Sequence, residues 1–248
     1  MLLAAVPMGT RRAFEVLRWE GIARFLNRAL WKIVHPVLRV ERVRFFESDL
    51  SRPLPPIPTR ASPDLRVGSL ADLSTFADGF ARLGVEIEDV RERLGRGDVF
   101  FLAVVRGEMA SLSWVTRNPT WVDEAAVWLQ LGPDEASVYG GTTLPAWRGF
   151  GLAPALWRYV EQWAREQGLV RLITWVRADN LQSVKTTLRL GRRPTRMVWK
   201  IWAFGMTRPH VLGVSHGDVS PVLSRTPPAG TPSDPLARPR RSRQALAR

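Results

Sequence analysis

One stretch in the second half of the chain constrains the fold more than any other, because a strand, a glycine-bearing turn and a helix follow one another directly. Residues 137–144 (SVYGGTTL) favour a strand, which Pro145 ends. Residues 148–151 form the turn, and Pro154 lies in the first helical turn, where a missing N–H costs nothing. Apolar residues then recur at helical spacing until Gly168, which can adopt the left-handed conformation that ends a helix. The sequence therefore predicts a strand–turn–helix unit.

The turn of this unit has the chemistry of an anion site. The first turn of a helix leaves its N–H groups without intrahelical partners, and the macrodipole adds partial positive charge there. Glycines at two turn positions let an anion approach the main chain, and an arginine adds a fork of donors. We therefore expect a phosphate or diphosphate at Arg148, Gly149, Phe150, Gly151, Leu152 and Ala153. The P-loop and the Rossmann fingerprint are excluded, because the Gly-Lys-Ser/Thr ending and the third glycine are missing.

Composition excludes several classes of function. The 248 residues are 45% hydrophobic and include no cysteine, which rules out disulfides, thiolate metal sites and a cysteine nucleophile. The net charge of +13 is concentrated at the ends: residues 1–60 carry +6, residues 223–248 carry +5, and the intervening body carries only +2. A nearly neutral body without a recognition module argues against nucleic-acid binding. We expect no metal cofactor and no nucleic-acid partner.

The N-terminal region contains a basic amphipathic segment. Residues 11–34 alternate apolar and arginine positions at helical spacing and include Trp19 and Trp31. Such a helix either packs on the body with a wet arginine face or lies on an anionic membrane surface. The first eight residues are too few to span a bilayer and lack the leading basic segment of a secretory signal. We therefore expect a cytoplasmic protein, with peripheral contact at the inner membrane face as an alternative.

The remaining pattern divides the chain into three parts. Residues 1–60 are expected to form a basic helical extension with a strand and a proline-rich linker, residues 61–210 the main domain, and residues 217–248 a disordered basic tail. Within the first two parts, we expect strands at 41–48, 65–67, 99–105, 109–115, 125–131, 135–144, 169–176 and 196–204, helices at 71–80, 87–94 and 181–190, and a loop at 118–121.

Two motifs resemble those of the GNAT N-acetyltransferase superfamily. Arg148-x-x-Gly151-x-Ala153 is similar to its acetyl-coenzyme A diphosphate loop, and Asn180-x-x-Ser183 followed by Arg189-x-Gly191 is similar to its second signature. The element order over roughly residues 63–205 also matches. The resemblance implies an α/β fold with a mixed, mostly antiparallel central sheet flanked by helices, and acetyl-CoA as the acyl donor.

The resemblance also implies roles for individual residues. The thioester would lie along the strand that ends at Thr143 and Leu144, and a backbone N–H near Thr143 would polarise its carbonyl. Asn180 would bond the pantetheine arm, and the small Ser183 would leave room for it. The chain departs from the family pattern at two positions, where Thr187 replaces a tyrosine and Arg192 replaces a phenylalanine.

The general acid and the general base stay open at this point. Thr187 is a poorer acid than a phenol, and Tyr139 is the alternative. An alkyl amine must lose a proton before it attacks, so we expect a carboxylate near the cleft. Glu135 and Asp134 lie at the start of the strand before the turn and are the first candidates, and Glu88 is a third.

The acceptor class is not set by the sequence beyond an amine. We expect acetyl transfer to a primary amine of a small molecule, peptide or glycan, and a homodimer is compatible with the sequence. Two alternatives remain. One is a catalytically silent membrane-associated or assembly protein with the same fold, and the other is an enzyme that takes a longer acyl-CoA or an acyl carrier protein as donor.

Overall fold

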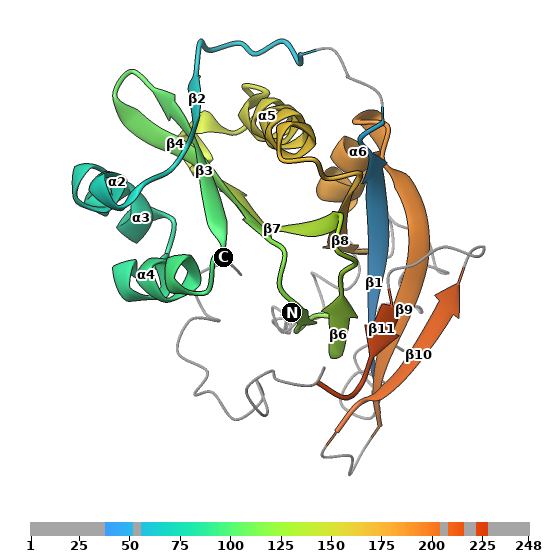
Figure 1. Cartoon of the computed structure of the whole chain (residues 1–248). Helices are drawn as coiled ribbons and strands as arrows, with labels where there is room; N and C mark the ends of the chain where they lie inside the picture. Colours follow the sequence, from blue (N-terminus) through green and yellow to red (C-terminus); the bar gives the residue numbers. More distant parts are fainter. Residues whose placement is uncertain (1–37, 52–55, 204–207, 216–221, 228–248) are drawn as a thin grey trace, which may run out of the picture.

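The computed structural model describes residues 38–51, 56–203, 208–215 and 222–227 of the chain. Its frame is an eight-stranded sheet with the order β10-β9-β1-β8-β7-β4-β3-β2 (Figure 1). The strands are β1 (Leu38–Asp49), β2 (Asp64–Val67), β3 (Val99–Val105), β4 (Glu108–Thr116), β7 (Glu135–Thr143), β8 (Arg171–Arg177), β9 (Arg193–Ala203) and β10 (His210–Ser215). Neighbouring strands are antiparallel except β7 and β8, which are parallel. The expected mixed, mostly antiparallel sheet is confirmed.

In the part of the chain that the structure describes, a smaller sheet and five α-helices pack around this frame. The smaller sheet has the order β11-β6-β5, formed by β5 (Thr120–Val122), β6 (Val127–Gln130) and β11 (Val222–Ser224). The helices are α2 (Leu70–Thr75), α3 (Ala77–Arg82), α4 (Ile87–Gly95), α5 (Leu152–Glu166) and α6 (Leu181–Arg189).

The two faces of β3 and β4 pack against different helices. Phe100 and Trp114 point to the side of α2–α4, where they meet Phe80 in one buried cluster. Phe101 points the other way and packs with Leu156 of α5. Figure 1 shows α2–α4 and α5 on opposite sides of these strands. Side chains alternate across a strand, so the continuous apolar run of β3 fills both cores.

Strand β1 is a central strand and not an appendage. It lies between β8 and β9, pairing from Val43↔Arg177 to Asp49↔Arg171 with the first and from Leu38↔Ala203 to Glu47↔Arg193 with the second. Its side chains Val43, Phe45 and Phe46 are fully buried. The expected boundary at residue 60 therefore does not separate the N-terminal part from the sheet, because the middle of the sheet includes residues that precede it.

Two local expectations differ from the structure. The helix expected over residues 71–80 is broken at Phe76, whose φ of −116° and ψ of 27° lie outside the helical region, so α2 and α3 are separate. The strand expected at 125–131 does not pair with the next strand in the chain, β7. It forms β6, which pairs with β5 inside the expected loop. The rings of Trp121 and Trp128 pack edge to face with centroids 5.6 Å apart, a cross-strand contact that stabilises this hairpin.

The C-terminal tail is partly ordered. Val222–Ser224 pairs with β6, and Leu223 packs against a core cluster that includes Val43 and Ile173. The expectation of disorder is therefore wrong for this strand. The segment at residues 11–34 and the tail beyond residue 227 lie outside the described residues. Among the helices that the structure describes, none is long and apolar enough to span a membrane.

Candidate active site

The parallel strands β7 and β8 separate in the middle of the sheet. They pair only from Glu135↔Arg171 to Ser137↔Ile173. Beyond that point β7 continues along β4 as far as Thr143, while β8 continues along β1 as far as Arg177. The edge of β7 that faces β8 therefore has no partner strand after Ser137 in the part of the chain that the structure describes. An extended ligand could bond to this open edge as a further strand would.

A β-bulge marks the open part of β7. The register with β4 shifts between Leu112 and Trp114, opposite Gly140 and Gly141. Gly140 has a φ of 60°, the left-handed conformation typical of a glycine bulge. A Cβ at Gly141 would lie 3.3 Å from Nε1 of Trp157 on α5. The bulge thus bends β7 away from its regular ladder where the strands part, and it brings the backbone close to α5.

The turn after β7 leads into the N-terminus of α5 as the sequence predicts. A short 3₁₀ turn (Pro145–Trp147) is followed by Gly149 and Gly151, whose φ angles of 83° and 81° are left-handed. Within the described residues, no acceptor is recorded for the backbone N–H groups of residues 149–153. Five consecutive N–H groups without an acceptor among the described residues, at a helix N-terminus, make this turn a candidate anion site.

An N-terminal segment lies against this turn. The backbone N–H of Arg60 donates to the carbonyl of Phe150 over 2.9 Å. A Cβ on Gly151 would lie 3.0 Å from the carbonyl oxygen of Pro58 and 3.6 Å from Cα of Thr59. The glycine is therefore required by a close backbone approach as well as by its φ angle. The side chain of Arg60 is exposed.

The other predicted diphosphate-site residues divide into exposed and buried groups. The side chain of Arg148 is exposed, and its Nε donates to the carbonyl of Thr143 over 3.3 Å. Leu144 and Leu152 are each 1% exposed, so only their backbone groups can face a ligand. Ala153 is partly exposed in the first turn of α5. The turn therefore presents main-chain donors and one flexible cation.

The second predicted motif begins α6. Oδ1 of Asn180 accepts the N–H of Ser183 over 3.1 Å, which makes Asn180 the N-cap of the helix. Both residues precede the buried Thr187, whose Oγ1 is recorded without a hydrogen-bond partner among the described residues. A fully buried hydroxyl cannot exchange protons with solvent, so the burial of Thr187 does not support it as the general acid. The coenzyme roles of Asn180 and Ser183 stay predictions.

The family's phenylalanine position is occupied by a buried ionic network. Arg192 is 3% exposed and lies over the ring of Trp157 at 4.5 Å. Its Nε and Nη2 donate to Oε1 of Glu161 over 3.2 and 3.1 Å, and Arg158 donates to Oε2 over 2.6 Å. Burial lowers the pKa of Arg192, and the charge of Glu161 opposes that shift. The network joins α5 to the start of β9 behind the bulge.

Tyr139 stands on β7 at the point where the strands part. Its hydroxyl donates to Oδ2 of Asp98 over 2.6 Å, and its ring lies between those of Trp114 and Trp175. Burial, together with the charge of Asp98 and the hydrogen bond to it, raises the pKa of Tyr139 well above its ordinary value. The phenol therefore holds its proton firmly. It is better suited to orient a ligand than to protonate a thiolate.

The three carboxylates expected as bases lie away from the bulge. Glu135 is 6% exposed at the opposite end of β7, where its Oε2 accepts the N–H of Gly132 and its Oε1 lies 3.4 Å from Arg171. Eight residues of strand place it about 25 Å from Thr143. Asp134 is exposed beside it, and Glu88 lies on the surface of α4 in an ion pair with Arg91. The structure does not bring any of them to the bulge.

Two other carboxylates contact aromatic side chains of the parting strands, and the sequence does not indicate them. Asp98 lies before β3 and is separated from Tyr139 by 41 positions. Glu124 lies in the turn between β5 and β6, and its Oε2 accepts the indole N–H of Trp175 over 3.2 Å. Both contacts join residues that are distant in the chain. A turn containing Asp123-Glu124 between two tryptophan-bearing strands was the only local signal.

Comparison with known proteins agrees with this geometry. Residues 75–191 match the model of the Acetyltransferase (GNAT) family. That range includes the parting strands, the turn, α5 and α6. A search of curated proteins finds no match. Among the described residues, no group of three or more His, Cys, Asp or Glu could hold a metal ion.

Solved structures are similar to this chain at low sequence identity. A GCN5-related N-acetyltransferase from Sphaerobacter thermophilus is 16% identical, with a TM-score of 0.50 over 77% of this chain and 57% of that one. An acetyltransferase from the GNAT family from Colwellia psychrerythraea is 17% identical, with a TM-score of 0.46 over 66% and 55%. An aminoglycoside N-acetyltransferase in complex with CoA is 20% identical, with a TM-score of 0.41 over 52% and 90%. The chain thus spans less than two thirds of the first two relatives.

Proposed function

We propose that this protein transfers an acetyl group from acetyl-CoA to a primary amine, because residues 75–191 match the model of the Acetyltransferase (GNAT) family. The single observation that carries the proposal is the arrangement at β7. Among the described residues, a strand edge without a partner strand leads directly into a turn whose five N–H groups, at a helix N-terminus, have no acceptor. A thioester donor carries a diphosphate at one end and an amide-bearing arm that could bond to a strand edge.

The chain's own groups fit both parts of this donor. The N–H groups of residues 149–153 would hold the diphosphate, and the exposed guanidinium of Arg148 would add charge-assisted bonds. The arm would then run along the open edge of β7 towards the bulge at Gly140. A free N–H there, near Thr143 or the bulge, would polarise the thioester carbonyl, a contribution of about 3 kcal/mol to the transition state.

The acceptor would attack the thioester directly. The amine nitrogen forms a bond to the carbonyl carbon, the carbon–sulfur bond breaks, and the coenzyme leaves as a thiolate that takes up a proton. Before this step the ammonium form must lose a proton, which requires a base. Tyr139, with its proton held by Asp98, would orient the acceptor.

Calorimetry and a thiol-release assay test the proposal. Titration of the purified protein with acetyl-CoA should give a calorimetric binding curve that fits a single site. In the thiol-release assay, at least one primary amine of a panel should cause the release of free coenzyme A. Arg148→Ala should weaken acetyl-CoA binding about tenfold or more, because hydrogen bonds to charged groups contribute about 1.5–3 kcal/mol. Arg91→Ala removes the same charge from the surface of α4 and should leave the affinity unchanged.

The alternative of a catalytically silent protein gives a different result. Acetyl-CoA would then produce no heat, or it would bind without thiol release from any amine of the panel. Acyl-CoA donors with longer chains belong in the same assay, because the turn contacts only the phosphate end of the donor. A wild-type protein that fails to bind acetyl-CoA and all longer acyl-CoA donors would refute the proposed function.

A further inference from the structure

Two aromatic rings occupy the face of the sheet where β7 and β8 part. Tyr139 and Trp175 come from the two separating strands, and their rings are nearly parallel, at 7°, with centroids 6.4 Å apart. Ser137 and Ile173 are the last registered pair, so both rings project to the same side by the two-residue alternation of strands. Both side chains are partly exposed. An acceptor that reaches the thioester from this side would contact them.

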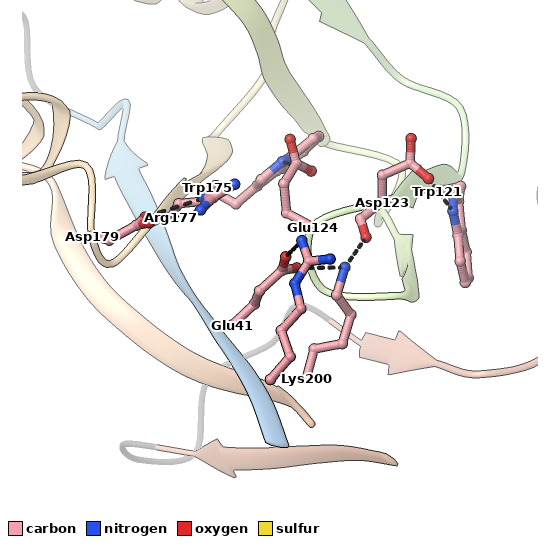
Figure 2. A network of polar contacts seen from close by, with 9 residues as sticks. Glu41, Trp121, Asp123, Glu124, Trp175, Arg177, Asp179 and Lys200 are labelled. Carbon is pink, nitrogen blue, oxygen red and sulfur yellow. Dashed lines mark hydrogen bonds and ion pairs between the residues drawn. The ribbon is translucent and has the colours of Figure 1, made fainter. Parts of the chain in front are cut away.

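A carboxylate lies at the edge of this aromatic pair. Oε2 of Glu124 accepts the indole N–H of Trp175 over 3.2 Å (Figure 2), and the ring of Trp175 is the one stacked beside Tyr139. Glu124 is itself partly exposed. It belongs to the turn between β5 and β6, whose core residues Val122 and Val127 pack on the same face of the main sheet as Ile173.

Hydrogen bonds to Asp123 hold the turn that carries Glu124. Nζ of Lys200, 2.8 Å from Oε2 of Glu41, donates to the carbonyl of Asp123 over 2.7 Å (Figure 2). The indole N–H of Trp121 donates to Oδ1 of Asp123 over 3.0 Å. Ala126, two positions after Glu124, has a φ of 54°, a left-handed conformation that is unfavourable for alanine. Strained backbone persists only where its surroundings determine it, and it concentrates at functional sites.

The charges around Glu124 leave it suited to a cation. Arg177 on β8 is the adjacent guanidinium, and it donates to both oxygens of Asp179 over 3.1 and 2.7 Å. On the other side of the pair, Arg93 of α4 lies over Trp114 and Tyr139 at 5.0 and 5.5 Å, near Asp98. Both arginines therefore have other anions or rings beside them. The Trp175 side of the pair offers an incoming ammonium group a carboxylate and an aromatic face.

We infer that Glu124 is the carboxylate that binds the ammonium group of the acceptor and removes its proton. The inference rests on the proposed acetyl transfer. One N–H bond of the ammonium group breaks, and its proton moves to a carboxyl oxygen of Glu124. The freed lone pair forms the bond to the thioester carbonyl carbon, the carbon–sulfur bond breaks, and a second N–H proton passes from the nitrogen to the departing thiolate. The proton later passes from Glu124 to water. The expected acceptor class is a primary alkylamine, protonated at neutral pH, with an apolar portion that packs on Trp175 and Tyr139.

The test compares Glu124→Gln with Glu88→Gln. The glutamine keeps a carbonyl oxygen for the indole N–H of Trp175 but cannot take a proton, whereas Glu88 is an exposed carboxylate on α4. With the best alkylamine from the panel, Glu124→Gln should lower kcat/KM by about 10²- to 10⁴-fold, the usual contribution of a general base. Its affinity for acetyl-CoA by calorimetry should equal that of the wild type. Glu88→Gln should match the wild type in both measurements.

A weakly basic acceptor gives a second, independent readout. A hydrazide is already unprotonated at pH 7 and needs no base, so the loss caused by Glu124→Gln should shrink to less than tenfold with a hydrazide of the same carbon skeleton. An equal loss with both acceptors, or a wild-type rate with the alkylamine, would overturn the role of Glu124. A wild-type protein that binds acetyl-CoA but acetylates no alkylamine would also overturn it. Lack of acetyl-CoA binding by the wild type would instead refute the proposed function.

Discussion

The close approach between Gly151 and the segment before β2 can be tested by a pair of alanine substitutions. Gly149 and Gly151 have almost the same left-handed φ, 83° and 81°. A Cβ at Gly149 would meet nothing within 4 Å, whereas one at Gly151 would lie 3.0 Å from the backbone oxygen of Pro58. Left-handed backbone costs an alanine about 1–2 kcal/mol, and overpacking against backbone adds about 1–3 kcal/mol. We expect losses of about 1–2 kcal/mol for Gly149→Ala and about 2–5 kcal/mol for Gly151→Ala.

Urea unfolding followed by tryptophan fluorescence measures both losses. The difference between the two variants isolates the contact with Pro58, because the cost of the φ angle is common to both. Equal losses would show that the segment at residues 56–61 does not lie against the turn in solution. The turn could then not be regarded as fixed before a ligand binds.

Three further predictions concern stability. Glu161→Gln should cost about 3–5 kcal/mol in urea unfolding, because it leaves the buried Arg192 without its counter-charge; a loss below about 1 kcal/mol would contradict the role of this network. Burial acts to raise the pKa of Glu41, but the hydrogen bond and charge of Lys200 outweigh it and lower that pKa. A carboxylate whose pKa is lowered by folding stabilises the protein at higher pH, and that stability is lost as the pH falls through the folded pKa. Below pH 4.5 the free energy of unfolding of Glu41→Gln should therefore fall less steeply with pH than that of the wild type. Parallel curves of unfolding free energy against pH would contradict a stabilising Glu41–Lys200 ion pair. Deleting residues 222–248 should lower the melting temperature more than a deletion that keeps β11, and equal melting temperatures would exclude β11 from the fold.

Local signals in the sequence predicted the unit that carries the proposed coenzyme site. The proline stop, the two turn glycines and the helical stripe all act within about 30 residues, and the structure has β7, the turn and α5 in that order. The GNAT resemblance of these motifs is confirmed by the match over residues 75–191. Here local propensity and the tertiary structure agree, so the sequence pattern is sufficient to predict this strand–turn–helix unit.

Long-range pairing limited the rest of the prediction. The placement of β1 between β8 and β9 depends on which strands meet across more than 120 positions, and the alternation within one strand carries no information about its partner. The general base is also difficult to predict from the sequence, because the contacts that identify a candidate join residues distant in the chain. Glu135 is a candidate from the sequence because it starts the strand that leads to the turn, yet the length of β7 separates it from the turn. Glu124 contacts Trp175 because the residues of β5 and β6 pack on the face of the sheet that carries Ile173 of β8.

The central claim is that backbone N–H groups at the start of α5 hold the diphosphate of the donor. Amide ¹H–¹⁵N spectra of deuterated protein titrated with CoA test it directly. The account predicts saturable downfield shifts for the amides of Gly149, Gly151, Leu152 and Ala153, weakened by Arg148→Ala. Saturable shifts confined to other residues, with these four amides unmoved, would contradict it.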